Sequence, residues 1–275
     1  GEPCFGVCFQ SGGLLGSLTL AENLALPLER WTDLDPETVA VIVRAAGASW
    51  QVVLQTDHAD LSAAFARQWA DTGARHESLI VAAERHDDGW AVWEQAPQIE
   101  PETGRPLNFL DVQVPAHLAF YRAGIAAVSD EDAYAGLLVS MHGAGIYRQR
   151  YGTQPELQLT HATEAKALVD AFVAEQEGAF AARAAPLGIE DELRWADYHR
   201  LQLYDRFSLY FCLCDVEGGE GGEVAGFRFE PLGGWRVALD PYPFVQSPAR
   251  FSLLRRLVPK RLWTQRGFSD AFPAL

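Results

Sequence analysis

The sequence predicts a mainly α fold with a small antiparallel β ribbon near the C-terminus. Apolar residues recur at helical spacing through most of residues 50–214. A glycine-rich break at residues 218–222 interrupts that pattern. Beyond the break, apolar and polar residues alternate, which is typical of strands. These three observations indicate a helical domain followed by a ribbon.

The helical pattern divides into six segments. Their expected bounds are 57–72, 77–85, 115–128, 130–147, 160–185 and 189–214. A proline-rich loop at 97–106 separates the second segment from the third. Thr160 is of a residue type that caps helix N-termini, so we expect the fifth helix to begin there.

The ribbon is expected at about residues 224–258. Residues 224–230 and 235–239 alternate faces, and Leu232-Gly233-Gly234 between them is typical of a hairpin turn. Residues 251–258 are a candidate third strand. The sequence therefore predicts one domain over 50–260, followed by a tail at 261–275.

Residues 1–46 differ in pattern from the rest. They contain a short apolar run with a glycine turn, a short helical segment at 20–28, and a helix start at Asp35-Pro36. Small residues at 45–49 form a joint to the following domain. We expect this piece to be a separate fragment or a flexible lead-in.

Composition excludes several classes of protein. The 275 residues include 22 Lys and Arg against 37 Asp and Glu, a net charge of −15. Such a chain is poorly suited to wrapping nucleic acid or an anionic membrane, although arginines can bind an anion locally. No apolar run approaches the ~20 residues that a membrane helix needs, and no secretion signal is evident. We expect a cytoplasmic protein with reduced cysteines.

Polar side chains recur on the apolar faces of the expected helices. The histidines on these faces are His58, His86, His117 and His142, and Asp205 lies between Leu201 and Leu209 at helical spacing. A single core histidine is most often satisfied by a backbone carbonyl. A buried carboxylate is costly unless it is paired or binds a metal. Taken together, the set indicates a shared zinc, iron or manganese site.

The sharpest local motif is His86-Asp87 at the end of an apolar helix, followed by Asp88 and Gly89. With His58 upstream and Asp205 downstream, the order of residues resembles the HD superfamily of metal-dependent phosphohydrolases. The resemblance implies an HD-like helical bundle in which His58, His86, Asp87 and Asp205 hold one divalent metal ion. It makes His117 and His142 the best matches for histidines that recruit a second ion. The lysine that often follows His-Asp in that superfamily is missing, which puts a nucleotide substrate in doubt.

Residues 50–260 also resemble a bacterial family of unknown function, domain-of-unknown-function family 3891. The resemblance rests on five segments: 55–62, His86 to Trp90, 103–106, 138–142 and 203–209. That family implies no activity.

Residues 1–44 are similar to the Q-loop region of ABC transporter ATPases, with Gln10 as the Q-loop glutamine. The chain has no G-x-x-x-x-G-K-[ST] loop to hold phosphates, so we expect no ATPase activity. An ordinary amphipathic lead-in remains the alternative for this piece.

These observations lead us to expect a metal-dependent hydrolase that acts on a small anionic phosphate ester. Asp88 is a candidate general base or a solvated turn residue. Arg148 and Arg150 are candidates for an anion clamp or for a solvated face. A noncatalytic regulatory or ligand-binding domain, or a di-iron oxygenase on the same scaffold, are the alternatives.

Overall fold

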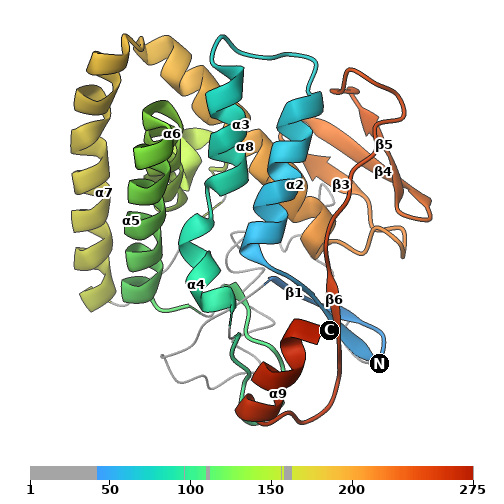
Figure 1. The fold of residues 1–275 in the computed structure, drawn as a ribbon. Coiled ribbons are helices and arrows are strands. Elements are labelled where there is room, and N and C mark those ends of the chain that lie inside the picture. The colour runs from blue at the N-terminus through green and yellow to red at the C-terminus, as the bar shows by residue number, and fades with distance from the viewer. Residues whose placement is uncertain (1–41, 96, 110–111, 156, 158–162, 275) are drawn as a thin grey trace.

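A computed structural model describes residues 42–95, 97–109, 112–155, 157 and 163–274. The fold is mainly α, with two small antiparallel sheets, one beside the helices and one below them in the view of Figure 1. The long helices are α2 (Gln55–Gln68), α3 (His76–Arg85), α5 (Val114–Glu131), α6 (Ala133–Ile146), α7 (Thr163–Ala184) and α8 (Asp191–Leu213). These six helices confirm the six predicted segments. No helix among the described residues is both long and apolar enough to cross a membrane.

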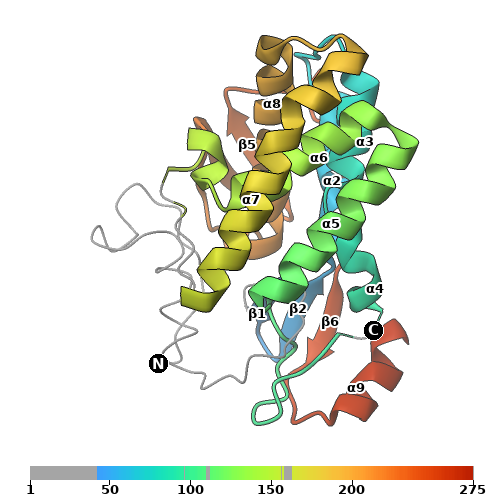
Figure 2. The ribbon, with the colours of Figure 1, turned by 90° about the vertical axis from the view of Figure 1, so that its left-hand side faces the viewer.

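Helix α6 lies at the centre of the helical layer. It contacts α3, α5, α7 and α8, and its residues 134–145 are all buried. The sequence of α6 is apolar all round, as expected of a helix enclosed by others. Figure 2 shows α5 and α7 covering one side of it. Asp132 caps the N-terminus of this helix, because its carboxylate accepts hydrogen bonds of 2.9 Å from the Tyr134 and Ala135 amides.

The predicted ribbon is present, with a different third strand. It comprises β3 (Gly222–Val224), β4 (Phe227–Gly233) and β5 (Arg236–Asp240) in the order β3-β4-β5. Gly233 and Gly234 adopt φ of +77° and +60° in the predicted turn. Residues 251–258 do not extend this ribbon, so that expectation was wrong. Residues Arg256–Pro259 form β6, which belongs to the second sheet.

That second sheet has the order β1-β2-β6 and crosses the expected boundary at residue 46. Strands β1 (Ile42–Ala46) and β2 (Ser49–Val53) form a hairpin, in which Gly47 turns with a φ of +56°. Strand β6 joins the other side of β2, with Trp50 opposite Val258. The small-residue joint at 45–49 is therefore a hairpin turn, and residues 42–46 pack with the segment that follows them.

The expected tail folds onto this sheet. Helix α9 (Gln265–Ala271) buries Phe268, which packs with Val52, Val258 and Trp263 in a small separate core. Trp263 and Phe268 meet edge to face at 5.7 Å. The expectations for residues 1–41, including the Q-loop resemblance at Gln10, lie outside the described residues.

Candidate metal centre

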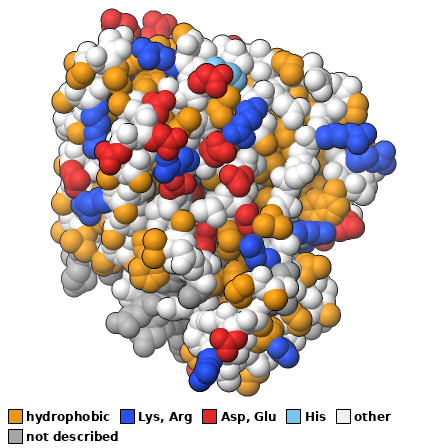
Figure 3. All heavy atoms as spheres, in the orientation of Figure 1, with side chains coloured by type: hydrophobic (Ala, Val, Ile, Leu, Met, Phe, Trp, Pro, Cys, Tyr) orange, Lys and Arg blue, Asp and Glu red, His pale blue; other side chains and the backbone are white. Residues whose placement is uncertain are grey.

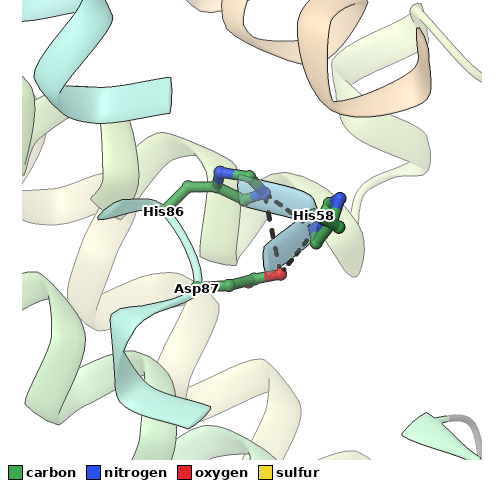
Figure 4. A group of neighbouring side chains, drawn as sticks. All are labelled: His58, His86 and Asp87. Carbon is green, nitrogen blue, oxygen red and sulfur yellow. Dashed lines mark hydrogen bonds and ion pairs between the residues drawn. The ribbon is translucent and has the colours of Figure 1, made fainter. Parts of the chain in front are cut away.

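The structure brings five of the predicted site residues together from four helices. His58 comes from α2, His86 ends α3, Asp87 follows it, His142 comes from α6 and Asp205 from α8. Each of these side chains is at most 5% exposed. Figure 4 shows His58, His86 and Asp87 pointing toward one another. Helical periodicity places the three histidines and Asp205 on core-facing stripes, and the turn after α3 brings Asp87 to them.

The potential ligand atoms are within a few ångströms of one another. His58 Nε2 lies 2.9 Å from Asp87 Oδ2 and 3.2 Å from His86 Nε2. Asp205 Oδ1 lies 3.7 Å from His86 Nε2 and 3.9 Å from His58 Nε2. Two groups of three residues therefore have the composition and spacing of a metal site. The first group is His58, His86 and Asp87, and the second is His86, His142 and Asp205.

Neighbouring groups fix the hydrogens of the first two imidazoles. His86 Nδ1 lies 2.9 Å from the Ala83 carbonyl, which can only accept, so Nδ1 carries the hydrogen. His58 Nδ1 lies 2.7 Å from the Ser208 hydroxyl, which donates its own hydrogen to the Asp205 carbonyl at 2.8 Å. His58 therefore also donates from Nδ1. In the neutral rings both Nε2 atoms present lone pairs, toward each other and toward Asp87.

Three electron-rich atoms at such distances need a cation between them. Without a metal, a proton takes that place. Burial opposes the charge on His86, but the Asp87 and Asp205 carboxylates outweigh it and raise its pKa to about 9. Burial would raise the pKa of Asp87, yet the positive charge on the neighbouring His86 holds it well below its usual range. The site is therefore built around positive charge.

A chain of hydrogen bonds runs from Arg150 to Asp87 and fixes the state of His142. The Arg150 guanidinium donates to Gln202 Oε1 at 2.6 Å, so the Gln202 amide nitrogen faces His142 Nδ1, 3.1 Å away. Nδ1 thus accepts, and the hydrogen of the neutral ring lies on Nε2. Nε2 is 3.4 Å from the Tyr121 hydroxyl, which donates to Asp87 Oδ1 at 3.0 Å.

His142 is neutral in this arrangement. Burial and the charge on His86 lower its pKa to about 3. A nitrogen that carries a hydrogen cannot ligate a metal, so the hydrogen bond from Gln202 makes His142 a hydrogen-bond donor at Nε2. The four other residues are then the candidates for supplying ligand atoms.

The geometry favours one ion. Both potential metal groups include His86, whose Nδ1 is committed to Ala83, and a single Nε2 cannot bind two ions. His117 lies outside both groups. It hydrogen-bonds the Tyr147 hydroxyl, and its ring packs against Tyr121 at 4.9 Å. The structure thus places His117 beside the site rather than in it.

Of the three predicted catalytic residues, one contacts the cluster. Arg150 is buried and forms an ion pair with Asp205. Arg148 is exposed and pairs with Glu177 at 3.1 Å, while Asp88 pairs with Arg85 at 2.5 Å. Among the described residues, neither Asp88 nor Arg148 has a hydrogen bond or ion pair to the metal cluster. These contacts fit Arg148 as a residue of a solvated face rather than of an anion clamp. They fit Asp88 as a turn residue rather than as a general base.

Arg150 enters the site from an unusual turn. Three consecutive residues, Gln149, Arg150 and Tyr151, have φ of +52°, +49° and +51°, and Gly152 follows at +87°. A left-handed backbone costs ~1–2 kcal/mol at each residue other than glycine. The ion pair with Asp205 and the hydrogen bond to Gln202 offset this cost. The strain therefore lies next to the candidate site, as is common at functional positions.

Gly89 holds the His86-Asp87 turn against α5. Its φ is not in the left-handed region, so it is not needed for the turn itself. A Cβ at this position would lie 2.0 Å from the Phe120 carbonyl oxygen. Glycine therefore allows α5 to approach closely enough for Tyr121, one residue further, to reach Asp87.

Sequence reasoning missed four supporting residues. Gln202 and Ser208 lie three residues on either side of Asp205 on α8, and Tyr121 lies four residues after His117, so helical spacing was an available signal for them. Glu94 gave no such signal. It ends α4 (Ala91–Glu94), and its buried carboxylate accepts the Gln55 and Thr56 amides, which caps α2 near His58.

The comparisons with known proteins agree with one resemblance. Neither the curated proteins nor the solved structures contain a match to this sequence. A family model described as "Protein of unknown function (DUF3891)" matches residues 41–260. The match begins at the residue before β1 and ends at the residue after β6, so it spans both sheets and the helices between them. The chain belongs to this family.

Proposed function

We propose that the protein is a metal-dependent hydrolase that acts on a phosphate ester. His58, His86, Asp87 and Asp205 would hold one divalent ion. The observation that carries this proposal is the meeting of two hydrogen-free imidazole nitrogens and a carboxylate oxygen within 3.6 Å of one another. Imidazole with carboxylate suits zinc, iron or manganese. When bound, such an ion supplies Lewis-acid chemistry that polarises a phosphoryl oxygen and makes water a stronger nucleophile.

The other residues of the site have separate roles in this proposal. Arg150 neutralises Asp205 at Oδ2, which leaves Oδ1 as the ligand atom. Tyr121 orients Asp87 by donating to Oδ1, which leaves Oδ2 to face the imidazoles. His142 donates from Nε2 to an oxyanion of the substrate, as a neutral imidazole does in other enzymes. The hydrogen bonds from Arg150 to Gln202 and from Gln202 to His142 fix this donor before substrate binds.

Two features support a phosphate ester as the substrate. The four proposed ligands are the residues that resemble the pattern of the HD phosphohydrolases. In addition, Arg150 Nε is buried and has no hydrogen-bond partner among the described residues. A guanidinium N–H left unpaired in a buried site is available to a phosphate oxygen. The net charge of −15 otherwise repels anions, so a local cation is needed to bind one.

Purification of the full chain without chelator, followed by elemental analysis, tests the metal site. A screen of phosphomonoesters and phosphodiesters with the metal found then tests the reaction. We expect Asp87→Asn to lose both metal and activity. The matched control is Asp88→Asn, the adjacent carboxylate, which pairs with Arg85 and should retain both. Loss of metal and activity in both variants, or in neither, would contradict the proposed site.

One observation favours a noncatalytic alternative. All four proposed ligands are at most 5% exposed, which suits a site that stabilises a regulatory or ligand-binding domain. In that case the ion is retained, no ester is turned over, and metal removal lowers stability alone. The oxygenase alternative predicts iron and consumption of dioxygen. The shared His86 favours one ion and so counts against a di-iron centre.

A further inference from the structure

A groove with a volume of about 930 Å³ lies apart from the metal centre, between β5 and residues 242–255. Leu61 and Phe65 of α2 and Phe211 of α8 line it from the helical layer. Small-molecule sites commonly have volumes of ~300–1,000 Å³. The groove therefore has the size of a ligand site, although neither the resemblances nor the metal centre accounts for it.

Aromatic rings form much of the lining. Phe251 packs edge to face on Phe65 at 4.7 Å and lies 4.8 Å from Phe244. Trp235 lines the groove from the β4–β5 turn, and Tyr242, which also lines it, is 43% exposed. Such a surface favours the aliphatic or aromatic part of a ligand.

The charges along the groove are of one sign. Arg236, Arg250 and Arg255 line it, and no Asp or Glu does. None of the three forms an ion pair with a carboxylate of the described residues, in a chain with a net charge of −15. The Arg255 guanidinium stacks 4.5 Å over Trp235 and donates to Gln51 Oε1 at 2.8 Å. Figure 3 shows basic side chains beside an apolar patch on the side where Figure 1 places β4 and β5.

Residues 242–249 form the outer wall of the groove, and hydrogen bonds hold this wall in place. The Tyr242 hydroxyl donates to the Gln246 carbonyl and accepts from the Ala249 amide at 2.9 Å. The Val245 amide bonds the Gln68 carbonyl at 2.9 Å, at the end of α2. A wall anchored in this way preserves the groove before a ligand binds, which lowers the entropic cost of binding.

We propose that this groove binds a small amphipathic organic anion, a free molecule with an apolar body and one carboxylate, sulfonate or phosphate group. The apolar body lies on the aromatic lining, and the anionic group pairs with the arginines of the rim. The positive rim in an otherwise acidic chain identifies the charge of the ligand, and the rings identify its body. The inference does not depend on the metal centre.

Fluorescence titration of the full chain with anilinonaphthalene sulfonate, in the presence of chelator, tests the proposal. We expect saturable binding of one probe per chain, displaced by dodecanoate at least tenfold more effectively than by neutral dodecanol. Equal displacement by the two would overturn the role of the arginines. Binding that does not saturate would overturn the site. So would binding to anionic phosphatidylglycerol vesicles with none to free dodecanoate, because the ligand would then be a membrane.

Variants locate the binding in the groove. The double variant Arg250→Gln/Arg255→Gln should weaken dodecanoate binding at least fivefold. The matched control is Arg228→Gln on β4, whose arginine pairs with Asp240 and does not line the groove. Ser252→Trp, at an exposed lining position, should block the probe without a change in the core. Unchanged binding in Ser252→Trp would place the probe elsewhere and refute the proposal.

Discussion

Removal of the Arg150 side chain tests the electrostatics of the candidate site in the absence of metal. Arg150 forms a buried ion pair with Asp205, which is 2% exposed, and donates to Gln202 at 2.6 Å. Arg150→Met keeps much of the volume and leaves Asp205 charged, buried and without its main partner. Breaking one side of a buried ion pair costs about 3–5 kcal/mol. For a chain of this size that lowers Tm by roughly 6–20 °C.

Urea unfolding in the presence of chelator, monitored by circular dichroism, measures this cost. The double variant Arg150→Met/Asp205→Leu removes both charges and should be less destabilised than the sum of the two single variants. Arg148→Met is the matched control, because that arginine is 47% exposed and pairs on the surface with Glu177. A cost below about 1 kcal/mol for Arg150→Met, or additive effects in the double variant, would refute the buried pair.

Three further predictions concern separate parts of the structure. Gly89→Ala should cost about 1–3 kcal/mol or more, because its Cβ would lie 2.0 Å from the Phe120 carbonyl oxygen; urea unfolding measures the loss, and a variant as stable as the parent would contradict the close approach. Burial raises the pKa of Glu94 from 4.5 to about 7, so its contribution to stability is complete below pH 4.5 and roughly 3 kcal/mol is lost as the pH rises to about 7. The Glu94→Gln variant should not show this loss of stability with rising pH when its unfolding is measured at several pH values. The same pH dependence in the variant and the parent would contradict the role of Glu94. Metal affinity should rise with pH up to about 9, because the ion displaces the proton that the carboxylates hold on His86; chelator competition that shows flat affinity over this range would argue against that displacement.

The sequence predicted the helices because their apolar residues follow a local period. Expected and observed bounds differ mainly at the ends, as for α2, expected at 57–72 and observed at Gln55–Gln68. Strand partners depend on contacts between distant parts of the chain. Nothing near Val258 indicates that it lies opposite Trp50, so β6 was assigned to the wrong sheet. The helix α9 is short, and its burial depends on that same sheet.

Helical spacing predicted which side chains face inward, but not how far in they lie. His117 shares a face with Tyr121, yet the tyrosine hydroxyl reaches Asp87 while the imidazole ends at Tyr147. Arg148 and Arg150 were indistinguishable in sequence. The left-handed turn at 149–152 directs the second arginine inward, and only its last residue is of a type that favours positive φ. The role of the His142 ring depends on Gln202, whose partner was not apparent from the sequence.

Calorimetric titration of the chelator-stripped full chain with zinc or manganese tests the central claim most directly. His86 belongs to both potential metal groups, so its removal affects any ion bound there. The account predicts one ion per chain in the parent, none in His86→Ala, and one in the His117→Ala control, since His117 lies outside both groups. Two ions per chain in the parent, no binding at all, or an unchanged titration in His86→Ala would contradict it.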